Sequence, residues 1–199
     1  MNRSILALAI LAVIACARTG VASPIQWSTA AGGNNHYYEV VTVGHVLPWA
    51  TAELAAESTG GYLATVTSAA EKDFLVGTFG DFLRGTWIGG FQSPGSVEPA
   101  GGWKWITGEP FVYTNWEPTE PNNSGGQENH LVFATAGSSV VGVWNDLNGV
   151  NPPTGFVGGY VVERVPEPST ISIAAVAAIG ALGFAWRNRR RQGTTFRVG

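Results

Sequence analysis

The chain reads NWEPTEPNN over residues 115–123, continues as SGGQE to Glu128, and returns to a related WND triplet at 144–146. These segments gather carboxylates and carboxamides, and no apolar side chain stands between Pro121 and Glu128. Hard cations such as Ca²⁺ prefer oxygen ligands, which Asp, Glu and Asn side chains supply. The composition of this loop therefore indicates a binding region rather than a part of the core.

Two plainer interpretations of the same residues remain open. Pro, Asn, Ser and Gly dominate ordinary turns, so the loop could be a surface turn without a ligand. Asn145 and Asp146 could form a hairpin turn that follows a core tryptophan at Trp144.

Charge argues against nucleic acid as a partner. The whole chain has a formal net charge of −3, but residues 23–164 hold four Lys/Arg against thirteen Asp/Glu. A nucleic-acid-binding surface needs a basic footprint, so no nucleic-acid partner is expected. Bound cations would relieve part of the repulsion among the acidic groups.

The N-terminal end has the features of a secretory signal peptide. Residues 1–22 contain Arg3, an apolar run and then small residues, in that order. An N-terminal core helix is one alternative, and a lipobox-like VIAC, which would carry a lipid on Cys16, is another. Because Cys16 is the only cysteine, the exported domain is expected to contain no disulfide.

The C-terminal end has three parts: Pro-Glu-Pro at 166–168, an apolar run over 171–186, and RNRRR over 187–191. The apolar run predicts a transmembrane segment, slightly shorter than the usual ~20 residues. Arginines favour the cytoplasmic side, which makes 192–199 a cytoplasmic tail. A buried last helix of the domain is the alternative.

The order of these three parts, over 165–191, resembles the PEP-CTERM sorting signal of bacterial export systems. The resemblance implies recognition and cleavage by an exosortase near the Pro-Glu-Pro motif. The protein is accordingly expected to be exported and membrane-anchored through its C-terminal segment. It would then reside on the cell surface or outside the cell.

Between the two signals, residues 25–164 are expected to form one domain. Its first half is expected to contain a strand at 37–43, a helix at 49–58, a short strand at 62–66, and a second helix from Thr67 or Ser68 to Phe79. The first helix should end at the glycine pair that follows it. Glu71, three residues after Ser68, is expected to complete a capping box.

The second half of the domain is expected to consist of strands and loops. The strands are predicted at 87–91, 103–106, 130–134, 140–144 and 159–163. Two early helices followed by antiparallel strands, with no βαβ alternation, predict the α+β fold class. The turn-rich stretch 108–127 is long for a compact domain, and such stretches are usually functional.

From Tyr37 to Glu163, an ordered set of motifs resembles the C-type lectin-like domain. The set comprises Gly60-Gly61-Tyr62-Leu63-Ala64, Glu71, Phe74, Trp87-Ile88-Gly89, Trp105, Gly108, Asn115-Trp116, Glu120-Pro121-Asn122, Glu128, Trp144-Asn145-Asp146 and Tyr160-Val161-Val162-Glu163. The resemblance implies a C-type lectin-like fold with two helices, short antiparallel sheets and a long loop region that binds Ca²⁺.

The same resemblance implies a metal site. By motif position its Ca²⁺ ligands would be Glu120, Asn122, Glu128, Asn145 and Asp146, and the first four would also contact carbohydrate. Ca²⁺ accepts about 6–8 oxygens, so two adjacent sugar hydroxyls could complete the shell. The Glu-Pro-Asn order is associated with mannose-type sugars, and the peptide bond before Pro121 is implied to be cis.

The chain departs from the family at its disulfides and at a second calcium site. Ala56 and Val162 stand where one cysteine pair would be, and His130 and about Gly149 where the other would be. A disulfide contributes about 2–4 kcal/mol, so the loop is expected to be looser, with bound Ca²⁺ doing more of the ordering. Asn123 and Asn129 replace residues that are often acidic, which argues against a second Ca²⁺.

No catalytic arrangement accompanies these motifs. His36, His45 and His130 lack metalloprotease spacing, and there is no Gly-x-Ser-x-Gly elbow. A glycosidase pair of Glu120 and Glu128 would conflict with their role as calcium ligands. We therefore expect a non-enzymatic, calcium-dependent domain that binds exopolysaccharide or another glycan. The alternative is a structural or protein-interaction module of the same fold that does not recognise sugar.

Overall fold

The structure, a computed structural model, describes residues 23–135 and 137–167. The chain divides into two compact units, 1–164 and 165–199, and all the described secondary structure belongs to the first. The predicted signal peptide 1–22, transmembrane segment 171–186 and tail 192–199 lie outside the described residues. Within the described part, no helix is long and apolar enough to cross a membrane.

The described domain combines two α-helices with one connected sheet, which confirms the α+β prediction. Its elements are β1 Ile25–Gln26, η1 Thr29–Ala31, β2 Tyr37–Thr42, α1 Trp49–Glu57, β3 Tyr62–Leu63, α2 Ala69–Phe79, η2 Gly80–Leu83, β4 Thr86–Gln92, β5 Trp103–Trp105, η3 Ser124–Gly126, β6 His130–Phe133, β7 Trp144–Leu147 and β8 Gly159–Arg164.

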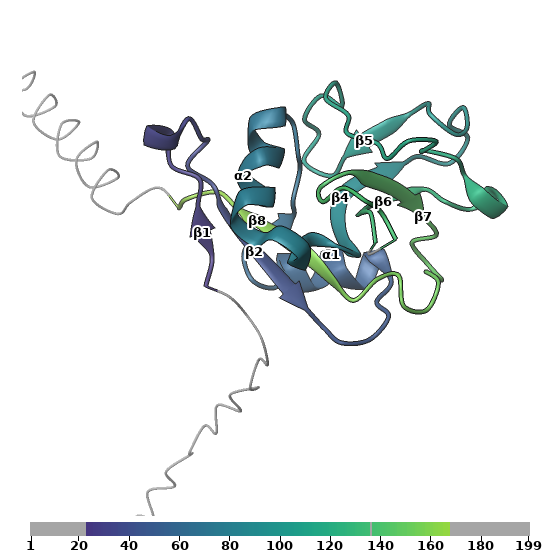
Figure 1. Ribbon diagram of the computed structural model, residues 1–199, viewed down its shortest axis with the longest axis horizontal. Coiled ribbons are helices and arrows are strands. Elements are labelled where there is room, and N and C mark those ends of the chain that lie inside the picture. The colour runs from purple at the N-terminus through teal and green to yellow at the C-terminus, as the bar shows by residue number, and fades with distance from the viewer. Residues whose placement is uncertain (1–22, 136, 168–199) are drawn as a thin grey trace, which may run out of the picture. The chain divides into compact units, whose positions relative to one another are not determined.

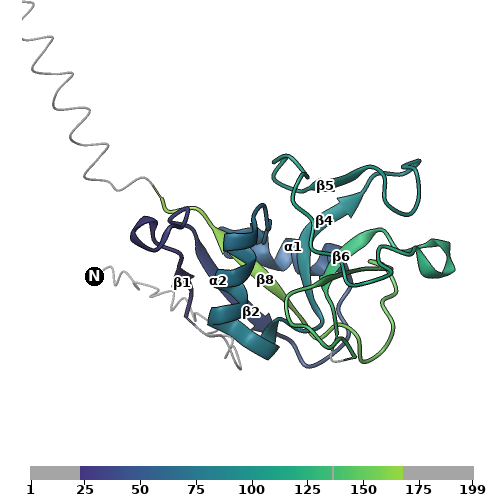
Figure 2. The same ribbon diagram turned by 45° about the horizontal axis from the view of Figure 1, so that its top comes forward.

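The sheet is mixed rather than purely antiparallel. Its strand order is β1-β2-β8-β4-β6-β7, with β3 added to β8 and β5 added to β4. β4 and β8 run parallel, whereas the other pairs are antiparallel. In Figures 1 and 2 α2 lies beside β2 and β8, whereas α1 lies beside β4, to which Trp49 donates a hydrogen bond at the Ile88 carbonyl. The long loop region is bonded to β7 at Trp144.

The strand predicted at 140–144 is wrong. The β7 strand begins at Trp144, the last residue of that range, and continues to Leu147. Gly142 has φ +88°, a left-handed conformation that is incompatible with an extended strand. Asn145 and Asp146 therefore lie within a strand, paired with Val132 and Leu131, and the hairpin-turn alternative is also wrong.

The second helix begins at the predicted residue, but its capping box is only half formed. The Ser68 hydroxyl accepts a hydrogen bond from the Glu71 backbone N–H at 3.1 Å. The Glu71 carboxylate turns elsewhere, accepting from the Thr67 backbone N–H at 2.8 Å and from the Tyr38 hydroxyl at 2.5 Å. Glu71 is 2% exposed, so its carboxylate is a buried hydrogen-bonding group of the core rather than a solvent-facing cap.

Candidate metal and ligand site

The loop that contains the predicted ligands is pinned at its base to β7. The Trp144 backbone N–H donates to the Asn115 carbonyl at 2.8 Å, and its carbonyl accepts from the Glu117 N–H at 2.8 Å. The Asn115 side-chain amide donates to the Gly142 carbonyl at 2.8 Å. Residues 115–117 thus form a short parallel pairing with Trp144, from which the rest of the loop and η3 project (Figures 1 and 2).

An aromatic cluster lies beneath this loop. Trp144, fully buried, meets the Trp105 and Trp116 rings edge-on at centroid distances of 5.6 and 5.9 Å. Trp103 contacts Trp116 at 5.1 Å, and Phe111 contacts Trp105 at 5.0 Å. Aromatic pairs each contribute about 0.5–1.5 kcal/mol beyond their buried area. The tryptophans therefore serve as core that supports the loop.

Asp146 links β7 to the tip of the loop. Its side chain is fully buried, with Oδ1 accepting from the Asn122 N–H at 3.1 Å and Oδ2 from the Asn123 N–H at 2.8 Å. Hydrogen bonds to an ionised carboxylate are stronger than those between neutral groups. Asp146 therefore holds the loop in place through the backbone of two consecutive residues.

Glu128 is held by the same loop tip. Its Oε2 accepts from the Ser124 N–H at 2.7 Å, and its own N–H donates to Asn123 Oδ1 at 3.0 Å. Burial raises the pKa of Glu128, and the nearby Asp146 carboxylate acts in the same direction. The structure therefore brings Glu128 and Asp146 to the same loop tip.

Glu120 is presented by a cis peptide bond with Pro121, which confirms the isomer that the sequence implies. Burial raises the pKa of Glu120 to about 7, and its interactions with Asp146, Glu128 and Glu117 also raise it. The carboxylate atom Oε2 of Glu120 is buried and has no hydrogen-bond partner. Asn145 Oδ1, on the neighbouring strand, is likewise buried without a partner.

These features fit a bound cation. Buried polar oxygens normally have partners, so the unpaired Glu120 Oε2, near the like charges of Asp146 and Glu128, is costly until a positive charge neutralises it. The basic side chains of the described domain bond elsewhere: Lys72 to Asp73, Arg84 to Asp81, Lys104 to Ser93 and Arg164 to Glu39. Across 23–135 and 137–167, no three Asp, Glu, His or Cys side chains could hold a metal alone. The carboxamides are therefore needed to complete any site.

The two missing disulfides are replaced by packed side chains. Ala56 and Val162 are both fully buried in one apolar cluster. The His130 ring lies 4.5 Å from the Trp49 ring, and a Cβ added to Gly149 would come within 2.2 Å of its Nδ1. The ring thus fills the space that a second side chain would need, and its burial lowers the pKa of His130 to about 4.

Two groups in the structure have roles that the sequence motifs do not predict. Asn123, a carboxamide at an often acidic position, bonds to both Glu128 and Asp146, and its place beside the Glu-Pro-Asn motif is the sequence signal for this role. The other group is a buried cluster away from the loop. There Glu163 Oε1 accepts from the Tyr38 hydroxyl at 3.1 Å and lies 2.6 Å from His36 Nδ1.

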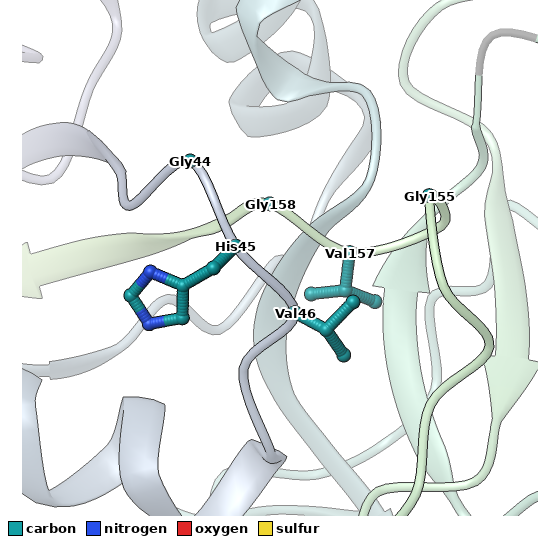
Figure 3. Close-up of a pocket in the computed structure, with 6 residues that line it drawn as sticks. All are labelled: Gly44, His45, Val46, Gly155, Val157 and Gly158. Carbon is teal, nitrogen blue, oxygen red and sulfur yellow. The ribbon is translucent and has the colours of Figure 1, made fainter.

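A separate pocket of about 340 Å³ lies between the segment before α1 and the segment before β8. Its lining residues are Gly44, His45, Val46, Gly155, Val157 and Gly158. In Figure 3 the His45 ring points away from the two valine side chains. The pocket is lined mainly by glycine backbone and valine, and includes none of the predicted ligands. It offers no convergent set of polar side chains for a specific ligand.

Comparisons with known proteins agree with the geometry. A family model described as Lectin C-type domain matches residues 45–149, more than half of the chain. A second model, described as PEP-CTERM protein-sorting motif, matches residues 164–191. Ladderlectin of Oncorhynchus mykiss is 36% identical over 125 residues, which cover 61% of this chain and 62% of that protein. The match thus spans less than two thirds of this relative.

Solved structures share the same fold. The cow C-type carbohydrate-recognition domain of CD23, crystallised in the presence of a GlcNAc2Man3 oligosaccharide, is similar with a TM-score of 0.53 and 28% identity. That similarity covers 67% of this chain and 90% of the CD23 domain. A calcium-independent type II antifreeze protein, 23% identical with a TM-score of 0.52 over 73% of this chain and 95% of that one, shares the fold alone.

Proposed function

This chain belongs to the C-type lectin domain family and carries a PEP-CTERM sorting motif, and from that premise we propose that it is an exported, calcium-dependent carbohydrate-binding protein. One observation carries the proposal: Glu120 Oε2 is buried without a partner near the carboxylates of Asp146 and Glu128. Asn145 Oδ1, on β7, is a second buried acceptor without a partner. A divalent cation would satisfy these acceptors and offset the concentrated negative charge.

Five residues would hold the ion: Glu120, Asn122, Glu128, Asn145 and Asp146. Their carboxylate and carboxamide oxygens are the ligands that Ca²⁺ prefers, whereas softer metals prefer sulfur or imidazole ligands. Bound Ca²⁺ would supply open coordination positions for ligand oxygens. The four exposed or half-buried members of the set, which are all except Asp146, can hydrogen-bond the same hydroxyls.

The proposed ligand is a glycan with vicinal equatorial hydroxyls, of the mannose type, because Glu120-Pro121-Asn122 keeps the order associated with such sugars. The domain would bind this glycan without chemical change. A bacterial exopolysaccharide is the proposed natural partner, because the sorting motif implies export and processing by an exosortase, with the lectin domain placed on the cell surface or outside the cell.

A glycan array read with and without a calcium chelator tests this proposal. We expect retention on mannose-type but not galactose-type glycans, lost when calcium is removed and lost in Glu128→Ala. Asp81→Ala, which removes an acidic side chain on η2 paired with Arg84, is the control and should bind as the wild type does. Calcium binding without retention on any glycan would favour a structural module of the same fold. A melting temperature that millimolar calcium leaves unchanged would refute the metal site itself.

A further inference from the structure

Asn123 connects Glu128 and Asp146, the two acidic residues at the loop tip, through hydrogen bonds. Its backbone N–H donates to Asp146 Oδ2 at 2.8 Å, and its side-chain Oδ1 accepts from the Glu128 N–H at 3.0 Å. Its carbonyl accepts from the Gly126 N–H at 2.8 Å, which closes the η3 turn. One half-buried residue therefore bonds to β7, to the turn and to the start of the segment that leads into β6.

The backbone conformation makes these three bonds compatible. Asn123 has φ 47° and ψ 47°, in the left-handed region that Asn and Gly adopt most readily among natural residues. In this conformation its N–H and its side-chain oxygen bond to different segments, Asp146 and Glu128. Asn122 contributes a parallel bond to Asp146 Oδ1, so the loop tip is fixed at two consecutive residues.

We propose that Asn123 is a positioning residue, which fixes the separation of Glu128 and Asp146 before a cation binds. This inference rests on the proposed function, because the consequence is calcium affinity. Asn123 links the two acidic residues through hydrogen bonds alone, from its backbone N–H to Asp146 and from the Glu128 N–H to its side-chain oxygen. The loop is therefore preformed even though the nearby disulfide is absent.

The test compares three variants of the full-length chain in a buffer with a mild detergent. Asn123→Gly keeps the left-handed backbone but removes the side-chain acceptor, whereas Asn123→Asp keeps an acceptor at the same place. Asn35→Gly is the matched control: Asn35 also has positive φ, 67°, and its Oδ1 accepts from the Thr29 N–H at 3.0 Å, outside the calcium loop. Calcium affinity is measured by calorimetric titration, and Glu128 amide exchange is measured in calcium-free protein.

We expect Asn123→Gly to weaken calcium binding by about tenfold or more, because the loss of a residue that orients metal ligands typically has an effect of this size. Glu128 amide exchange should accelerate in the same variant without calcium, since its acceptor is gone. Asn123→Asp should restore both, and Asn35→Gly should change neither.

Two results would contradict the inference in different ways. Equal calcium affinity in the wild type and Asn123→Gly would overturn the positioning role alone, even if the variant melts at a lower temperature. A wild-type chain that binds no calcium would overturn the proposed function, and the calcium consequence of this inference with it.

Discussion

Replacing both His130 and Gly149 by cysteine is expected to create a stabilising disulfide beside the calcium loop. The backbone of Gly149 has no positive φ, and an added Cβ would point straight at the His130 side chain, 2.2 Å from Nδ1. Removing the imidazole and adding a side chain at Gly149 therefore places two small side chains face to face. The same contact predicts that Gly149→Ala alone is destabilising, because the added methyl group would collide with the ring.

The expected gain in stability follows from the length of the loop that the disulfide closes. A crosslink between residues 130 and 149 encloses roughly 20 residues, which corresponds to about 3 kcal/mol of unfolded-state entropy. Against this stands the lost contact of the His130 ring with Trp49, now at a centroid distance of 4.5 Å, which is worth about 0.5–1.5 kcal/mol. The oxidised variant should therefore be more stable than the wild type by about 2 kcal/mol.

The assay is urea unfolding of residues 23–167, followed by tryptophan fluorescence, with the variant compared in its oxidised and reduced forms. This segment contains no native cysteine, so the engineered pair can form only one intramolecular bond. The free energy of unfolding of the oxidised form should exceed that of the reduced form by about 3 kcal/mol. Failure to form the bond in mild oxidant, or a less stable oxidised form, would refute the placement of the two positions.

Two further predictions concern the opposite end of the domain. Arg164→Met should lower the unfolding free energy in urea by about 3 kcal/mol, because Glu39, 2% exposed, would lose its partner at 2.6 Å. The double variant Glu39→Gln/Arg164→Met should recover most of that loss. A double variant as unstable as Arg164→Met would contradict this cause. The second prediction concerns pH. The hydrogen bond with Glu163 raises the pKa of His36 in the folded protein. Protonated His36 therefore stabilises the fold fully below about pH 6.5, and this contribution is lost as the pH rises through the raised pKa. His36→Gln should flatten the fall in unfolding free energy between pH 6 and 9. Burial raises the pKa of Glu120 to about 7, which leaves a residual slope of the same sign in the lower part of this range. An unchanged slope in His36→Gln would show that this pair does not contribute.

Local features of the fold were predictable because they depend on neighbouring residues. The helix capped by Ser68 begins where predicted, since an N-cap bonds to a backbone group only three residues away. The cis bond before Pro121 was also predictable, because the resemblance that implies it is carried by the adjacent residues Glu120-Pro121-Asn122. The strand predicted at 140–144 does not form because Gly142, in a left-handed conformation, interrupts the run of valines that favours an extended strand.

The site was predictable in its residue types and only partly in their roles. The sequence order placed Glu120 and Glu128 on one loop and Asp146 on a later segment, and the structure brings Glu128 and Asp146 together. The sequence could not indicate that Asp146 is fully buried and binds the backbone of the loop. That role depends on the β6–β7 register, which pairs Asp146 with Leu131, and no local pattern specifies it.

The sequence by itself determined the α+β class, the two helices, the acidic and carboxamide composition of the loop, and the family to which these motifs belong. Only the tertiary structure decided how the loop is held: by the Trp144 cluster beneath it, by Asp146 and Asn123 at its tip, and by the His130 ring in place of a disulfide. The physical reason is range. Capping, turn and cis-proline preferences act between neighbours, whereas burial and long-range hydrogen bonds depend on which distant strands the sheet places side by side.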